Sequence, residues 1–140
     1  MDESVDERAE RAPQGMDADV LIVDDDPPIR NLLRQVFRRV GLDAREAKDG
    51  QEALSLIEER RPRLMMLDLM MPRMNGWQVL EHLKDNDLLE SIPVVVLTAV
   101  GGHRTEGLKE NFGVRAILGK PFEIHDLITT VKSILEEPVS

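Results

Sequence analysis

The sequence predicts a doubly wound α/β domain, in which a five-stranded parallel sheet carries helices on both faces. Its 140 residues with 41% hydrophobic content are enough for one globular domain and too few for two ordinary ones. Short unbroken apolar runs alternate with segments of helical periodicity, which is typical of parallel strands buried on both faces. We expect residues 18–137 to form this domain and residues 1–17 to form a disordered acidic arm ahead of it.

The first unit is a strand at residues 20–23, an acidic turn and a helix. Pro27 and Pro28 suit the first turn of that helix, where a missing amide donor costs least, and Gly41 suits its end. The face of the helix is marked by apolar residues at spacings of three and four: Ile29, Leu32, Leu33, Val36, Phe37 and Val40.

The same alternation continues to the end of the chain. The order of flavodoxin-like sheets, 2-1-3-4-5, is adopted by analogy, because it is a common order for doubly wound folds. The expected elements are a weak strand at 43–46, a helix containing Ala53, Leu54 and Ile57, a strand at 64–67, a helix at 76–84, a strand at 94–97 that Thr98 ends, a glycine-interrupted fourth helix within 101–113, a strand at 116–118, and a last helix faced by Leu127, Ile128, Val131, Ile134 and Leu135.

Charge and composition exclude several classes of function. The formal charge is −9, and residues 1–17 hold six acidic and two basic residues, a balance of −4. An acidic chain without a basic patch argues against direct binding of nucleic acid. The chain has no cysteine, so disulfides and thiolate metal sites are excluded. No segment approaches the roughly 18 apolar residues of a membrane span, so we expect a soluble cytoplasmic protein.

Polar residues collect where the predicted strands end. The carboxyl ends of parallel strands meet at one edge of the sheet, where ligands bind in doubly wound folds. We therefore expect residues far apart in sequence to form one site. They are Asp24, Asp25 and Asp26 after the first strand, Asp68 after the third, Thr98 after the fourth and Lys120 after the fifth.

The crowded carboxylates predict a metal site. Several carboxylates at a partly dry site repel one another unless some protonate or a cation lies among them. An all-oxygen ligand set selects a hard divalent ion such as Mg²⁺. In this interpretation Asp25 and Asp68 are direct ligands, Asp24 acts through water, and the backbone carbonyl of Met70 completes the protein ligands.

A carboxylate beside such an ion is a suitable nucleophile toward a phosphoryl group, because the metal and a nearby ammonium offset charge on the transferring oxygens. Asp68 is the expected nucleophile. Lys120 is expected to pair with that carboxylate and later with the phosphoryl oxygens, and the Thr98 hydroxyl is expected to donate to them.

The chain resembles the receiver domains of response regulators. The resemblance spans residues 19–136 and rests on four segments in order, VLIVDDDPPIR, LMMLDLMMPRMNGWQVL, VVVLTA and GKPF. It implies phosphoryl transfer from a histidine kinase or phosphotransfer protein, and a bond before Pro121 that is commonly cis. The implied roles are phosphoacceptor for Asp68, Mg²⁺ organisation for Asp24 and Asp25, and response to the phosphoryl group for Thr98 and Lys120.

Two departures from the family pattern bear on the response. Ile117 stands where many receivers have an aromatic ring that swings inward on activation. Met70 and Val100 stand where the family's side chains flank the attacking water, and both are apolar. Because neither can hold a water in line, we predict slow hydrolysis of the aspartyl phosphate.

The signal is expected to leave through a protein partner rather than through catalysis, since the chain ends after its last helix without an output domain. The glycines of segment 101–113 should make the fourth helix the least stable one and suited to switching, so that helix, the fifth strand and the last helix are the expected output face.

Three other hypotheses of function remain, and they are not equally well supported by the sequence. A receiver-shaped interaction module that needs no phosphate is compatible with Ile117, although the acidic pair and Lys120 argue against it. A Mg²⁺-dependent phosphatase would carry a second acid where Met70 stands, and a flavin carrier would place its phosphate beside three repelling aspartates. We expect surface positions, not metal ligation, for His82, His103 and His125.

Overall fold

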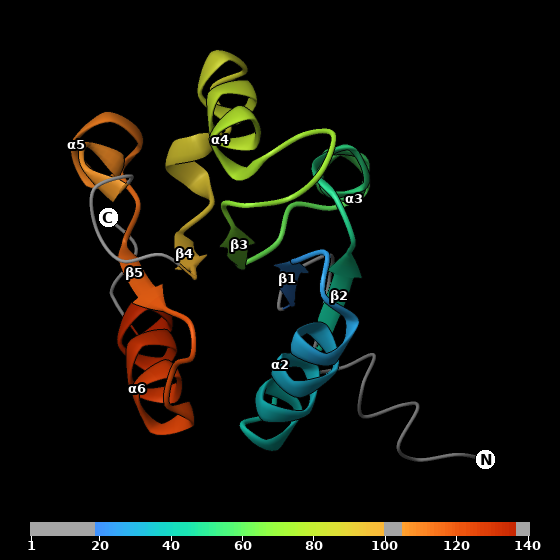
Figure 1. Cartoon of the computed structure of the whole chain (residues 1–140), viewed down its shortest axis with the longest axis vertical. Coiled ribbons are helices and arrows are strands. Elements are labelled where there is room, and N and C mark those ends of the chain that lie inside the picture. Colours follow the sequence, from blue (N-terminus) through green and yellow to red (C-terminus); the bar gives the residue numbers. More distant parts are fainter. Residues whose placement is uncertain (1–18, 100–104, 137–140) are drawn as a thin grey trace.

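A computed structural model of the protein describes residues 19–99 and 105–136. The predicted arm at 1–17, the position of Val100 and the residues from Gly101 to His103 lie outside the described residues. Five parallel strands form one sheet in the order β2-β1-β3-β4-β5 (Figure 1). This confirms the predicted fold class and strand order.

The five predicted strands and the helix predicted at 76–84 are present within one residue at their ends, and α2, α3 and α6 contain the apolar residues that predicted them except Val40, whereas the fourth helix is shorter than the segment expected for it. The η2 segment is a single 3-10 turn that was not predicted. The strands are β1 (Val20–Val23), β2 (Ala44–Ala47), β3 (Leu64–Asp68), β4 (Val94–Thr98) and β5 (Ala116–Gly119). The helices are α2 (Pro27–Arg39), α3 (Gly50–Glu59), α4 (Gly76–Asp85), η2 (Leu89–Ser91), α5 (Leu108–Phe112) and α6 (Ile124–Leu135).

Two apolar cores lie on opposite faces of the sheet. Successive side chains of a strand point to opposite faces. Leu21 of β1 therefore packs in the core under α3, α4 and α5, whereas its neighbour Ile22 packs in the core under α2 and α6. Figure 1 shows these two sets of helices on either side of the sheet. Both faces of the central strands are buried, which is why their sequences are continuous apolar runs.

Local signals explain where the helices begin. Pro27 occupies the first turn of α2, as the missing amide donor allows. The Asp49 side chain accepts a hydrogen bond from the Glu52 backbone N–H at the start of α3. At the start of α4, Asn75 and Gln78 form a reciprocal capping box. Such caps contribute on the order of 1 kcal/mol each.

The start of α4 also depends on Gly76. A Cβ atom at this position would lie 2.7 Å from the backbone oxygen of Asp68 and 2.8 Å from the Cα atom of Leu69. Such distances are too short for an ordinary side chain, so glycine lets α4 begin directly against the end of β3. Trp77, the single tryptophan, is the next residue and packs against the core under α3, α4 and α5.

The helix expected within 101–113 is short where the structure describes it. The α5 helix covers five residues between Gly107 and Gly113, which have φ angles of 82° and 66°. These left-handed conformations favour glycine and end helical structure on both sides. Gly107 and Gly113 therefore bound this helix, and its low stability and its role in switching stay predictions.

Candidate metal site at the carboxyl edge of the sheet

The strand ends bring the predicted polar residues to one edge. Asp24 follows β1 directly and Asp68 is the last residue of β3, whose register pairs Val23 with Leu67. On the other side of β3, Leu97 is the register partner of Asp68, and Thr98 is the next residue. Lys120 follows β5, and its backbone N–H donates to the Thr98 carbonyl at 2.7 Å.

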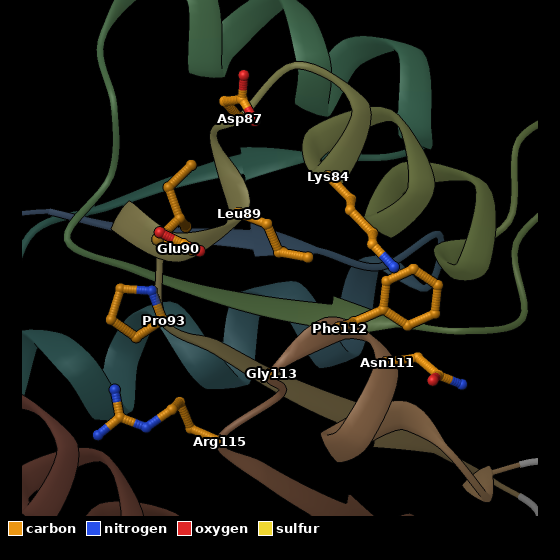
Figure 2. A pocket seen from close by; sticks show the side chains of 10 residues that line it. Lys84, Asp87, Leu89, Glu90, Pro93, Asn111, Phe112, Gly113 and Arg115 are labelled. Carbon is orange, nitrogen blue, oxygen red and sulfur yellow. The ribbon is translucent and has the colours of Figure 1, made fainter.

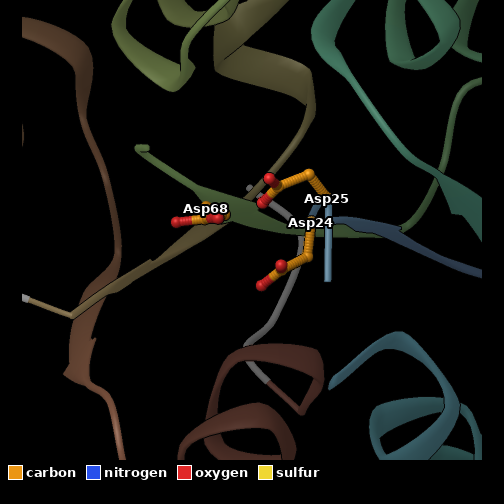
Figure 3. Close-up of side chains that lie close together, drawn as sticks. All are labelled: Asp24, Asp25 and Asp68. Atoms are coloured by element: carbon orange, nitrogen blue, oxygen red, sulfur yellow. The ribbon is translucent and has the colours of Figure 1, made fainter. Parts of the chain in front are cut away.

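Three carboxylates converge at this edge (Figure 3). One oxygen from each of Asp24, Asp25 and Asp68 lies within 4.8 Å of the others. Asp24 and Asp68 are buried, whereas Asp25 is exposed. Carboxylate oxygens at this spacing, and without sulfur or imidazole, fit a hard divalent cation such as Mg²⁺. Among the described residues this is the one group of three acidic or histidine side chains with that geometry.

Lys120 supplies a cation to this group. Its Nζ atom lies 2.7 Å from Asp24 Oδ2 and 3.5 Å from Asp68 Oδ2. Burial alone would lower the pKa of Lys120, but the hydrogen bond and the negative charge of Asp24, together with Asp68, raise it overall. Lys120 therefore remains an ammonium between the two buried carboxylates.

Asp68 is an acid with an unusual environment. Its burial, followed by the negative charge of Asp24, raises the pKa of Asp68 from 3.8 to about 6. A hydrogen bond from the Met70 backbone N–H to Asp68 Oδ1 at 3.1 Å and the charge of Lys120 act in the opposite direction. The carboxylates of this group thus repel one another, and a bound cation would relieve that repulsion.

Arg30 holds the acidic turn in place, and sequence reasoning missed it. Its Nη1 atom donates to the backbone carbonyl of Asp24 at 2.7 Å, and its Nε atom donates to Glu46 Oε1 at 3.0 Å. The Asp26 backbone N–H donates to Asp24 Oδ1 at 2.9 Å. The available signal was an arginine one turn into the helix after the acidic run, but only the fold shows that it reaches back to Asp24.

The other residues singled out from the sequence lie on or just after β3, β4 and β5. Thr98 is buried at the end of β4, one strand from Asp68. Met70 is the most exposed large apolar residue described, at 57%. Ile117 is half-buried on β5 and packs against the core under α5. The peptide bond between Lys120 and Pro121 is cis, as the resemblance implies.

A hollow of the described surface lies at the other end of the sheet (Figure 2). It has a volume of about 580 Å³ and is bordered by Pro93, just before β4, and Arg115, just before β5. These residues mark the amino ends of the strands, opposite to Asp68. Its charged residues have both signs, Lys84 and Arg115 against Asp87 and Glu90, so it selects no class of ligand.

Comparisons with known proteins agree with this geometry. The sequence profile of the response regulator receiver domain matches residues 20–132. The polar-differentiation response regulator DivK of Brucella anthropi is 34% identical over 120 residues, which cover 86% of this chain and 98% of DivK. The DNA-binding dual master transcriptional regulator RpaA of Synechocystis is 34% identical over 116 residues, but this chain spans only 48% of RpaA.

Solved structures give the same result. The CheY-like receiver domain protein of Methanospirillum hungatei superimposes with a TM-score of 0.74 at 32% identity, covering 84% of this chain and 93% of that one. No helix in the part of the chain that the structure describes has the length and hydrophobicity needed to cross a membrane.

Proposed function

Because the chain belongs to the response regulator receiver domain family, we propose that Asp68 accepts a phosphoryl group in a two-component phosphorelay. The donor is a histidine kinase or phosphotransfer protein, the reaction depends on Mg²⁺, and the phosphorylated chain signals through a cytoplasmic protein partner. As part of this proposal, residues 18–137 are the receiver domain and residues 1–17 are an arm outside it.

The observation that carries this proposal is the environment of Asp68. A nucleophilic carboxylate must be ionised, reachable and next to positive charge that can offset the oxygens of the transferring group. Asp68 has Lys120 Nζ at 3.5 Å and two further carboxylates within 4.8 Å that can hold a cation. With a pKa of about 6, Asp68 is mostly ionised at neutral pH.

Each residue of the site has its own role in phosphoryl transfer. An Asp68 oxygen attacks phosphorus, the new P–O bond forms, and the bond from phosphorus to the donor's imidazole nitrogen breaks. Asp25, Asp68 and the Met70 carbonyl, with Asp24 through water, would hold Mg²⁺, whose charge would offset negative charge on the phosphoryl oxygens. Lys120 turns from Asp24 toward the phosphoryl oxygens, and the Thr98 hydroxyl donates to one of them.

The output face lies on α5, β5 and α6. A shallow hollow of about 470 Å³ lies over the beginning of α5 and includes Ile117 of β5. Thr98 is joined to this face because Lys120 donates to its carbonyl and Gly119 is its register partner. Phosphorylation adds about −1.5 to −2 charge next to Thr98. We expect α5, which has only five residues, to change its conformation in response.

An interaction module that works without phosphate is the second candidate, and it rests on Ile117 in place of an aromatic residue. Beryllofluoride, a mimic of the phosphoryl group, separates the two. With Mg²⁺ and beryllofluoride, the receiver should show a saturable change in Trp77 fluorescence and backbone amide shifts along α5 and β5. The variant Asp68→Asn should lose both. Saturable binding of Mg²⁺ without any beryllofluoride effect would favour the second candidate.

A further inference from the structure

An apolar groove lies between the last turns of α2 and α6, on the face of the sheet away from α5. We call it the helix-end groove. It has a volume of about 190 Å³, and its apolar lining is Phe37, Val40, Leu42, Ile128, Val131 and Leu135. Phe37 and Val131 belong to the core on this face, whereas the other four are half-buried. The groove is thus the point where this core reaches the surface.

Basic side chains border the groove. Lys132 lies on its α6 side, and Arg34 and Arg38 line an adjoining hollow that shares Leu42 with it. Two acids, Glu136 and Asp43, also line the two hollows, and Arg34 is bonded to Glu46. Arg38 and Arg39 of the last turn of α2 are exposed. The border is therefore basic on balance, in a chain whose formal charge is −9.

The described chain begins beside this groove. The Val20 backbone N–H donates to the Asp43 carbonyl at 2.9 Å, and the Arg63 backbone N–H donates to the Asp19 carbonyl at 2.9 Å. The Arg63 side chain in turn donates to the Leu135 carbonyl at 3.4 Å. Asp43 and Leu135 line the two hollows, so Asp19, the first described residue, lies beside them.

We propose that the N-terminal arm, residues 1–17, docks in cis on the helix-end groove, with its apolar side chains in the groove and its acids against the basic border. The arm carries a charge of −4, and its large apolar residues are Met1, Val5 and Met16. Met16 is three residues before Asp19, a span of roughly 10 Å when extended.

Tethering favours the arm over a separate partner as the occupant. A segment joined to the domain by a few residues has an effective concentration in the millimolar range, so a small groove with a few charge contacts is enough to hold it. A free peptide or a second copy would need far more buried surface for the same occupancy. The docked arm adds a regulatory contact to α2, the helix whose Arg30 holds Asp24.

A spin label on the arm tests the contact directly. Because the chain has no cysteine, Ser4→Cys provides one attachment site. In the full chain, the label should broaden amide signals at the ends of α2 and α6 and leave those of α4 unaffected. Mixing labelled with unlabelled chains should not transfer the broadening. Transfer between chains would show a second copy as the occupant and overturn docking in cis.

Variants separate the contact from effects on folding. Arg38→Glu should remove most of the broadening, whereas Lys109→Glu, the same charge change on α5, should leave it unchanged. Met16→Asp and Val5→Asp lie in the arm, so their effect does not depend on the stability of the domain, and each should weaken the broadening. Broadening spread evenly over the surface, or insensitive to all of these variants, would overturn the proposal.

Discussion

Lys120 Nζ lies closer to Asp24 than to Asp68, at 2.7 Å against 3.5 Å. The lysine thus lies against the buried acid that follows β1 and offsets its charge. A divalent cation held by the three carboxylates would offset the charge of Asp24 instead and leave Lys120 to the acceptor and its phosphoryl group. The lysine is therefore the side chain whose partner should change most between the metal-free and phosphorylated forms.

The first prediction concerns the control of Asp68 by this lysine. The charge of Lys120 lowers the pKa of Asp68, although burial and Asp24 raise it to about 6 overall. Lys120→Gln should therefore raise the pKa of Asp68 further, as measured by titration of its side-chain carboxyl signal by NMR without Mg²⁺. The control Lys132→Gln, at the far end of α6, should leave it unchanged. A pKa that stays at about 6 in Lys120→Gln would contradict this prediction.

The raised pKa of Asp68 also predicts how stability depends on pH. Below the unfolded value of 3.8 the carboxyl is neutral in both states, and the folded state loses stability relative to the unfolded one as the pH rises through about 6. The neutral isostere Asp68→Asn should then stabilise the protein without Mg²⁺ at neutral pH by up to about 3 kcal/mol, and by almost nothing near pH ~3.

Urea unfolding at both pH values measures this difference. Asp126→Asn, an exposed position on α6, is the matched control and should change stability little at either pH. An equal gain for Asp68→Asn at both pH values would show that packing, and not charge, is responsible.

Arg30 should matter for Mg²⁺ although it touches no ion. It donates to the backbone carbonyl of Asp24 and to Glu46, whereas Arg34 donates to Glu46 alone in the described contacts. Arg30→Met should weaken Mg²⁺ binding roughly tenfold, equivalent to about 1.4 kcal/mol, measured by Trp77 fluorescence. Arg34→Met leaves the contact between Arg30 and Asp24 in place, so it should change the affinity for Mg²⁺ less than about twofold. Equal losses in the two variants would assign the effect to Glu46.

The lifetime of the phosphoryl group should depend on Met70. Its apolar side chain is exposed beside the acceptor, and its backbone N–H donates to Asp68. The purified phosphoprotein with Mg²⁺ should therefore persist well beyond seconds, and Met70→Asn should shorten its half-life by roughly tenfold, because an amide can hold a water in line. Leu32→Asn, an exposed apolar residue of α2, is the control. A wild-type half-life of seconds would refute slow hydrolysis.

Most of the fold follows from local sequence signals. Continuous apolar runs such as residues 94–97 mark strands buried on both faces, and Pro27 marks a helix start, so the strands could be predicted to within one residue. The meeting of Asp24 and Asp68 also followed, because parallel strands end at one edge. The glycines of segment 101–113 pointed to a weak fourth helix, but the five-residue length of α5 was not predicted.

The details of the site could not be predicted in the same way. Arg30 reaches Asp24 because α2 packs beside β2, a contact between elements that no local pattern encodes. The sequence predicted that Lys120 pairs with Asp68, but its closest carboxylate is Asp24. That choice depends on side-chain positions about an ångström apart, which spacing along the chain does not determine.

The intact mass of the protein after incubation with acetyl phosphate and Mg²⁺ tests the central claim most directly. The wild type should gain the mass of one phosphoryl group on Asp68, and omission of Mg²⁺ should prevent this gain. Asp68→Asn should show no gain, whereas Asp126→Asn should behave as the wild type. A wild-type chain that binds Mg²⁺ and gains no mass, or a gain that persists in Asp68→Asn, would contradict the assignment of Asp68 as the phosphoacceptor.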